Sequence, residues 1–221
     1  MAFYNSINNG DNFFISFSTN PKQDFGVFAK GYKKAASVLT EHLLAKPRFP
    51  DYEAYPVVFL YRQAFELYIK GFYYKAVLIA FFKNNQEFEN SQEIKKIEKN
   101  LNIHQLTPFS KAFKRMCLLF FPSDQELLKL AEKVNQFAVD FDKIDIDSSA
   151  YRYPINTKGK SPTKSNQVVN LLALHESMQK FLGELEVVNF GFDVEAFQAQ
   201  EFYEIMQSTQ DLIDSENGEA D

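Results

Sequence analysis

The sequence predicts an all-α protein of six or seven helices with a short irregular N-terminal arm. Two observations predict this class. Apolar residues recur at three- and four-residue spacing through most of the 221 positions, and prolines gather between two of these stretches, as in AKPRFPDYEAYP. The 24 Phe and 11 Tyr, with no Trp, indicate a core built from phenyl and phenol rings.

Each predicted helix follows from its own pattern of apolar residues. Pro56 suits the first turn of a central helix that is apolar nearly all the way round. Ser123 or Asp124 can cap a later helix with acids in its first turn. Residues 84–102 are polar and look like a surface insertion between two core helices. The expected helices are Lys22–Leu44, Pro56–Asn84, Ser91–Lys99, His104–Phe121, Asp124–Phe141, Asn166–Leu185 and Val194–Ile213.

Charge divides the chain into three parts. We expect an arm over residues 1–21, a bundle over 22–190 and an acidic helix and tail over 191–221. From Asp193 onward there are nine acidic residues and no Lys or Arg, so the rest carries 20 acids and 24 bases. The acidic part could fold over a basic surface and screen it, or it could be an amphipathic helix with a solvated face and a frayed end.

Targeting signals are not evident in the sequence. The first residues mix Asn, Ser and Asp, unlike a secretory signal. The apolar run from Tyr55 to Phe82 contains four Lys, Arg or Glu side chains, which would make membrane insertion costly. The single Cys117 cannot form an internal disulfide and fits a small core residue. We therefore expect a soluble, cytoplasmic protein that does not associate with a membrane.

The run YPVVFLYRQAFELYIKGF, residues 55–72, carries charges at Arg62, Glu66 and Lys70. Four residues advance a helix by about 400°, so the three side chains form one narrow stripe on an otherwise apolar rod. Such a stripe needs either a buried partner or a solvent-filled cleft. It is therefore either the edge of a binding site or an internal polar ladder.

A second feature is the loop that follows DKIDID. It has no acid from Ser148 to His175 but holds Arg152, Lys158, Lys160 and Lys164, together with Gly159. Such a loop could hold a phosphate or a nucleic-acid backbone, although a solvated basic loop is the plainer interpretation. Arg152 stands between Tyr151 and Tyr153, which favours a docked side chain.

Three segments in this order, YPVVFLYRQAFELYIKGF, NIHQLTPFSKAF and DSSAYRYPINTKG, resemble bacterial HEPN-like proteins over residues 55–185. The resemblance implies an antiparallel helical bundle that often forms a homodimer. It also implies a link to RNA cleavage, to nucleotidyltransferase partners and to antiviral defence or toxin–antitoxin systems.

The chain departs from the HEPN ribonuclease pattern at the positions that matter for catalysis. The family's signature is an Arg followed four to six residues later by His, and none of the four arginines here has a His in that window. Where the resemblance shows titratable groups, this chain has Gln63, Gln105 and Asn156. Losing groups that transfer protons indicates a branch without catalysis.

Metal and cofactor sites are not predicted. His42, His104 and His175 lack the spacing of metal ligands, and no glycine-rich nucleotide motif is present. A cluster of acids around residues 140–147 suggests a divalent ion, but the glycine and the final glutamate of a calcium loop are missing. These acids are Asp140, Asp142, Asp145 and Asp147.

Three hypotheses remain. In the favoured one the chain is a non-catalytic binding module for RNA, a nucleotide or a partner protein. The alternative is a metal-independent ribonuclease in which Arg62 or Arg152 stabilises phosphate charge and His104 transfers a proton. The third is a structural bundle outside this family. Burial of Arg62 against Glu66 would argue against the ribonuclease. The predicted site residues are Arg62, Glu66, Lys70, His104, Tyr151, Arg152, Tyr153, Lys158, Lys160 and Lys164.

Overall fold

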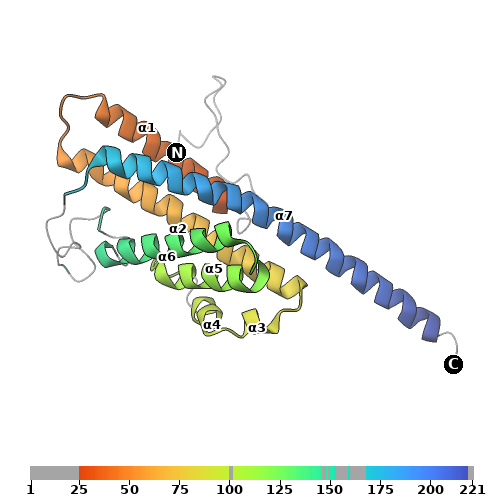
Figure 1. The fold of residues 1–221 in the computed structure, drawn as a ribbon. Coiled ribbons are helices and arrows are strands. Elements are labelled where there is room, and N and C mark those ends of the chain that lie inside the picture. The colour runs from red at the N-terminus through yellow and green to blue at the C-terminus, as the bar shows by residue number, and fades with distance from the viewer. Residues whose placement is uncertain are drawn as a thin grey trace, which may run out of the picture.

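The computed structural model describes residues 25–99, 102–145, 148, 150–152, 159 and 168–218, with side chains as far as Leu212. Every regular element in these ranges is a helix, so the prediction of an all-α helical bundle is confirmed (Figure 1). The predicted arm over 1–21 lies outside the described residues. The helices are α1 (Phe25–Leu44), α2 (Asp51–Phe82), α3 (Gln86–Glu89), α4 (Gln92–Glu98), α5 (Thr107–Phe120), α6 (Gln125–Ile144) and α7 (Leu171–Gly218).

Helix α2 is the centre of the bundle. It packs against α1, α5 and α7, and nearly every turn between Val57 and Ala80 has buried side chains. A helix that is apolar around most of its circumference has to be covered in this way. The central helix expected from the apolar run is therefore in the core.

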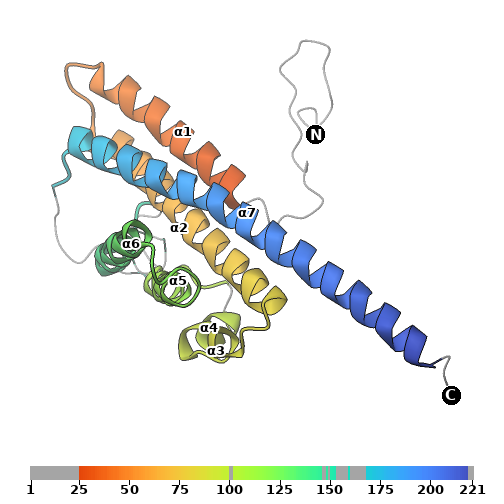
Figure 2. The same ribbon diagram turned by 45° about the vertical axis from the view of Figure 1, so that its right-hand side comes forward.

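The long helices α2 and α7 run parallel. Tyr61 of α2 is hydrogen-bonded to His175 of α7. Further along both helices, Lys83 at the end of α2 pairs with Glu195 of α7. Helix α1 runs in the opposite direction to both (Figures 1 and 2). Helices α1 and α2 are thus antiparallel, as are α5 and α6, whereas α7 runs parallel to its neighbour α2.

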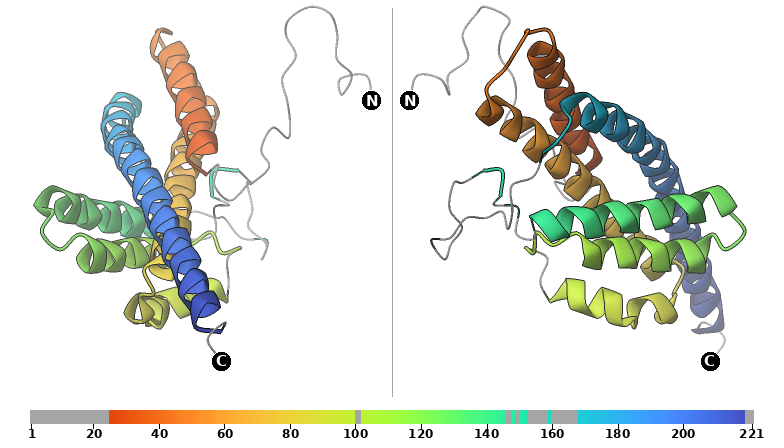
Figure 3. Two further views of the ribbon diagram at one scale, coloured as in Figure 1. Left: turned by 90° about the vertical axis from the view of Figure 1, so that its right-hand side faces the viewer. Right: turned by 60° about the vertical axis from the view of Figure 1, so that its left-hand side comes forward.

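Helix α6 reaches the rest of the core through aromatic side chains. Phe137 of α6 stacks on Phe181 of α7 with ring centroids 4.1 Å apart, and Phe65 of α2 packs against both rings. Figure 3 shows α5 and α6 side by side, running at an angle to α7. Phenyl rings therefore make the contacts by which α6 packs against α2 and α7.

Two predicted boundaries differ from the structure. Helix α2 begins at Asp51 rather than Pro56, so Pro56 lies inside the helix. The segment predicted as a surface insertion is partly core, because Phe88, Ile94 and Ile97 are buried. Its short helix α4 is capped by Ser91, whose hydroxyl accepts from the main-chain N–H of Ile94.

Helix α7 is one continuous element of 48 residues, whereas two helices were expected, ending at Leu185 and beginning at Val194. The helix continues because Leu185 and Phe192 are both buried, which keeps the intervening turns packed on the bundle. Its last part extends away from the body (Figure 1). It does not fold back over the other described helices. No helix in the described ranges combines the length and apolar character needed to cross a bilayer.

Candidate functional site

Arg62 lies at the centre of the predicted site and is completely buried, with 0% of its side chain exposed. One terminal nitrogen donates to Oε2 of Glu66 at 2.8 Å. The other donates to the main-chain oxygens of His104 at 2.8 Å and Asp145 at 3.2 Å. A planar guanidinium can make such contacts in several directions at once. Arg62 therefore joins α2 to the segment before α5 and to the end of α6.

Glu66 is the second buried member of this network. Its Oε1 accepts from Nζ of Lys70 at 2.8 Å and lies 2.9 Å from Nδ1 of His104. Burial alone would raise the pKa of the Glu66 carboxyl, but Lys70, Arg62 and His104 outweigh it and the pKa is lowered. Glu66 is therefore a carboxylate at neutral pH and accepts from three side chains.

Asp145 closes the network from the end of α6. Its Oδ2 lies 3.5 Å from Nε of Arg62, and its Oδ1 accepts from the main-chain N–H of Ala150. Asp145 itself is 2% exposed. The charges of buried Arg62 and of partly buried Lys70 are thus balanced by those of Glu66 and Asp145, as buried charges require.

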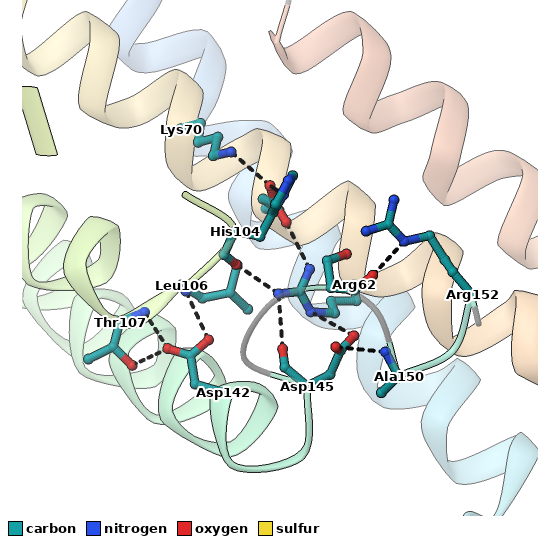
Figure 4. Close-up of polar contacts among 11 residues, drawn as sticks. Arg62, Lys70, His104, Leu106, Thr107, Asp142, Asp145, Ala150 and Arg152 are labelled. Carbon is teal, nitrogen blue, oxygen red and sulfur yellow. Dashed lines mark hydrogen bonds and ion pairs between the residues drawn. The ribbon is translucent and has the colours of Figure 1, made fainter. Parts of the chain in front are cut away.

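One turn earlier on α6, Asp142 positions the start of α5. Its carboxylate accepts from the main-chain N–H groups of Leu106 and Thr107 and from the Thr107 hydroxyl. These are amide groups that the first turn of a helix leaves without partners. Figure 4 shows Asp142 in contact with Leu106 and Thr107, and Asp145 in contact with Arg62 and Ala150.

Arg152 is held separately from this network. Its Nε donates to the main-chain oxygen of Ser148, and its guanidinium lies 5.4 Å from the ring centre of Phe59 on α2. A cation at that distance from an aromatic face is attracted by it. In the view of Figure 4, Arg62 lies between His104 and Arg152. The sequence-based expectation of a docked Arg152 agrees with this position.

The predicted site residues therefore fall into three groups. Arg62, Glu66, Lys70 and His104 meet in one hydrogen-bonded network. Tyr151 and Arg152 follow Asp145 closely in the chain. The pKa of the Tyr151 phenol is raised, mainly by burial and to a smaller extent by the negative charge of Asp145. The remaining four, Tyr153, Lys158, Lys160 and Lys164, lie outside the described residues.

His104 is the member of the network most open to solvent. Its side chain is 47% exposed, whereas that of Lys70 is 14% exposed. Because the Glu66 carboxylate only accepts hydrogen bonds, Nδ1 of His104 carries a proton. Nε2 has no hydrogen-bond partner among the described residues. A buried carboxylate thus orients an imidazole whose second nitrogen is available for binding or for proton exchange.

Sequence reasoning missed the structural roles of Asp142, Asp145 and Phe59. The two aspartates were noted only as conceivable ligands of a divalent ion. In the described part of the chain no three His, Cys, Asp or Glu side chains are grouped so that they could hold a metal ion. Nothing in the spacing of Asp142 and Asp145 shows that they meet Thr107 and Arg62, because these partners lie 35 and 83 positions away.

Comparison of the chain with protein-family models, with curated proteins and with solved structures finds no match.

Proposed function

We propose that the protein is a HEPN-like helical binding module that accepts the phosphate groups of RNA or of a nucleotide, without catalysis by Arg62. The observation that carries this proposal is the complete burial of Arg62, whose guanidinium is engaged by Glu66, by two main-chain oxygens and by Asp145. A buried arginine with these partners holds the surrounding residues in place and cannot reach a phosphate in solvent.

The binding surface is the edge above this network, formed by Tyr55, Arg152, His104 and Lys70. Tyr55 is exposed on α2, one turn before Phe59, on whose ring Arg152 lies. Exposed aromatic rings stack on bases, and arginine pairs with phosphate through two parallel hydrogen bonds. The basic composition of the segment around Arg152 favours the same anionic ligand.

The resemblance of residues 55–185 to HEPN-like proteins supports two further parts of the proposal. The first is a homodimer, since such bundles often pair. The second is a place in a bacterial defence or toxin–antitoxin system. Size-exclusion chromatography with light scattering tests the homodimer directly, and a monomer at micromolar concentration would contradict it.

Binding is tested by fluorescence anisotropy with a labelled single-stranded RNA and with a labelled nucleotide. Arg152→Ala should weaken the affinity and reduce its dependence on salt, because one fewer phosphate contact is made. Arg115→Ala is the matched control, since Arg115 lies on α5 and pairs with Glu87. The proposal fails if neither ligand binds, or if both substitutions weaken binding equally.

A metal-independent ribonuclease is a second candidate, favoured by one observation. The Nδ1 atom of His104 is oriented by Glu66 while Nε2 has no partner among the described side chains, an arrangement that suits a general acid or base. If this candidate holds, RNA is cleaved in the presence of EDTA and His104→Ala abolishes the cleavage. Intact RNA after prolonged incubation with the wild-type protein would exclude it.

A further inference from the structure

Helix α7 has a second apolar face besides the one that packs on the bundle. Six large apolar side chains along it are each between 61% and 74% exposed. At about 100° per residue they fall within an arc of about 140°. Phe192 and Tyr203, which contact α2, lie on the opposite side. The exposed residues of this face are Val187, Phe190, Phe197, Phe202, Ile205 and Leu212.

A groove continues this face onto the body of the protein. It lies between α7 and the first half of α6, and its volume is about 630 Å³. Leu127, Leu130 and Phe192 contribute apolar side chains to it. Val187 belongs both to the groove and to the exposed face of α7. The two features therefore form one apolar surface that runs from α6 along the projecting helix, and we call it the α7 surface.

The charge around the α7 surface is negative. Both lysines at the groove are paired with neighbouring glutamates, Lys129 with Glu126 and Lys133 with Glu184. Asp124 also lines the groove, as does Glu195, which pairs with Lys83. From Asp193 to the end of the chain there are nine acids and no Lys or Arg. At about 100° per residue Glu201 lies within the apolar arc and Glu204 beside its edge, so an occupant that covers this face must bring cations to both.

A second copy of α7 does not meet this requirement. An in-register pair of α7 surfaces would place Glu201 and Glu204 of each chain beside the same residues of the other, with no Lys or Arg from Asp193 onward to offset them. Like charges at a helix–helix seam are destabilising and select against that pairing. Charge complementarity instead favours a different chain.

We propose that the α7 surface docks a cationic amphipathic helix of another protein. Apolar side chains at three- and four-residue spacing on that helix would fill the groove and cover the exposed face, as helices do in hydrophobic grooves. Its lysines or arginines would lie against Glu201 and Glu204. This surface is separate from the edge at His104 and Arg152, so it does not depend on the function proposed there.

The experiment uses the full-length protein and two labelled peptides of 21 residues. Both carry leucine at helical spacing, one with lysine and one with glutamate at the remaining positions. Anisotropy should show saturable binding of the lysine peptide only. Phe197→Asp should weaken that binding by about tenfold or more, as expected for an anchor at the centre of an interface. Gln207→Asp, the same added charge on an exposed position away from the apolar arc, should leave it unchanged.

Glu201→Gln provides a second variant that keeps the apolar face intact. It should weaken binding and reduce the dependence of affinity on salt, because one charge contact is lost. Circular dichroism confirms that each variant keeps its helical content. Equal binding of both peptides, or equal loss in Phe197→Asp and Gln207→Asp, would overturn the proposal. A wild-type dimer that Phe197→Asp converts to a monomer would also overturn it, because a second copy would then be the occupant.

Discussion

The guanidinium of Arg62 and the carboxylate of Asp145 lie 3.5 Å apart at Nε and Oδ2, and Arg62 also donates to the main-chain oxygen of Asp145 at 3.2 Å. The two residues are 83 positions apart in the chain. Their contact joins the middle of α2 to the end of α6 in a place without solvent. The positive charge of Arg62 therefore stabilises the packing of α2 against the end of α6.

Arg62→Ala should lower the free energy of unfolding by roughly 3–5 kcal/mol, because it leaves the buried carboxylate of Asp145 without its cation and removes one partner of Glu66. Arg62→Lys should recover little of this loss, since one ammonium cannot reach all the acceptors. Urea denaturation measures both variants. Lys129→Ala, at an exposed ion pair, is the control and should change stability by less than about 0.5 kcal/mol. An Arg62→Ala protein as stable as the wild type would refute the structural role.

Glu66 makes the stability depend on pH in a defined direction. The pKa of its carboxyl is lowered from the usual 4.5 in the folded protein, so the unfolded chain binds more protons on acidification. Its stabilising contribution is present above 4.5 and is lost as the pH falls through the folded value. The difference in unfolding free energy between wild type and Glu66→Gln should therefore shrink below about pH 4.5. A difference that stays constant with pH would argue against the charged network.

Two glycines of α1 should respond oppositely to alanine. A Cβ on Gly26 would lie 2.6 Å from the side-chain nitrogen of Asn189, whose oxygen accepts from buried Lys75 at 2.7 Å. Moving that amide would disturb the contacts of Lys75, so Gly26→Ala should destabilise the protein. Gly31 has nothing within 4 Å, and Gly31→Ala should stabilise the helix by about 0.5–1 kcal/mol. Thermal melts of both variants test this contrast, and melting temperatures that shift in the same direction would count against it.

Asp142→Ala should destabilise the protein by about 1–2 kcal/mol, because the start of α5 loses acceptors for the N–H groups of Leu106 and Thr107. Hydrogen exchange at these two amides should become faster. Asp140→Ala is the matched control on the same helix, since Asp140 is exposed and pairs with nearby Gln136 and Lys143. Unchanged protection of both amides in Asp142→Ala would contradict the assignment.

Local features of the fold could be read from the sequence. Asp124, one of the two residues predicted as the cap, caps α6, because capping depends on residues three positions away. The four-residue spacing of Arg62, Glu66 and Lys70 gives the ion pairs that a helix implies. The contact of the second acid of the network, Asp145, could not be predicted, since it depends on where α6 ends relative to α2. That kind of proximity is set by tertiary packing and not by local pattern.

The prediction that the helix is interrupted near residue 190 was wrong for a related reason. Asn189 and Gly191 weaken a helix locally, and the sequence alone gives no sign of what compensates. In the structure the Asn189 side chain accepts from Lys75 of α2, and Phe192 is buried against α2 and α5. Packing between distant segments overrides the local preference. The exposed apolar face of α7 could likewise not be recognised from two separate predicted helices, because its residues align only along one continuous helix.

The central proposal is that a phosphate ligand binds at the edge formed by His104 and Arg152, and the three histidines allow one direct measurement. NMR spectra of the imidazole groups are followed while RNA or a nucleotide is added. His42 lies on α1 and His175 is hydrogen-bonded to Tyr61, so both serve as internal controls. The resonances of His104 should shift to saturation while those of His42 and His175 stay in place. A bound ligand that leaves His104 unmoved, or that shifts all three alike, would contradict the account.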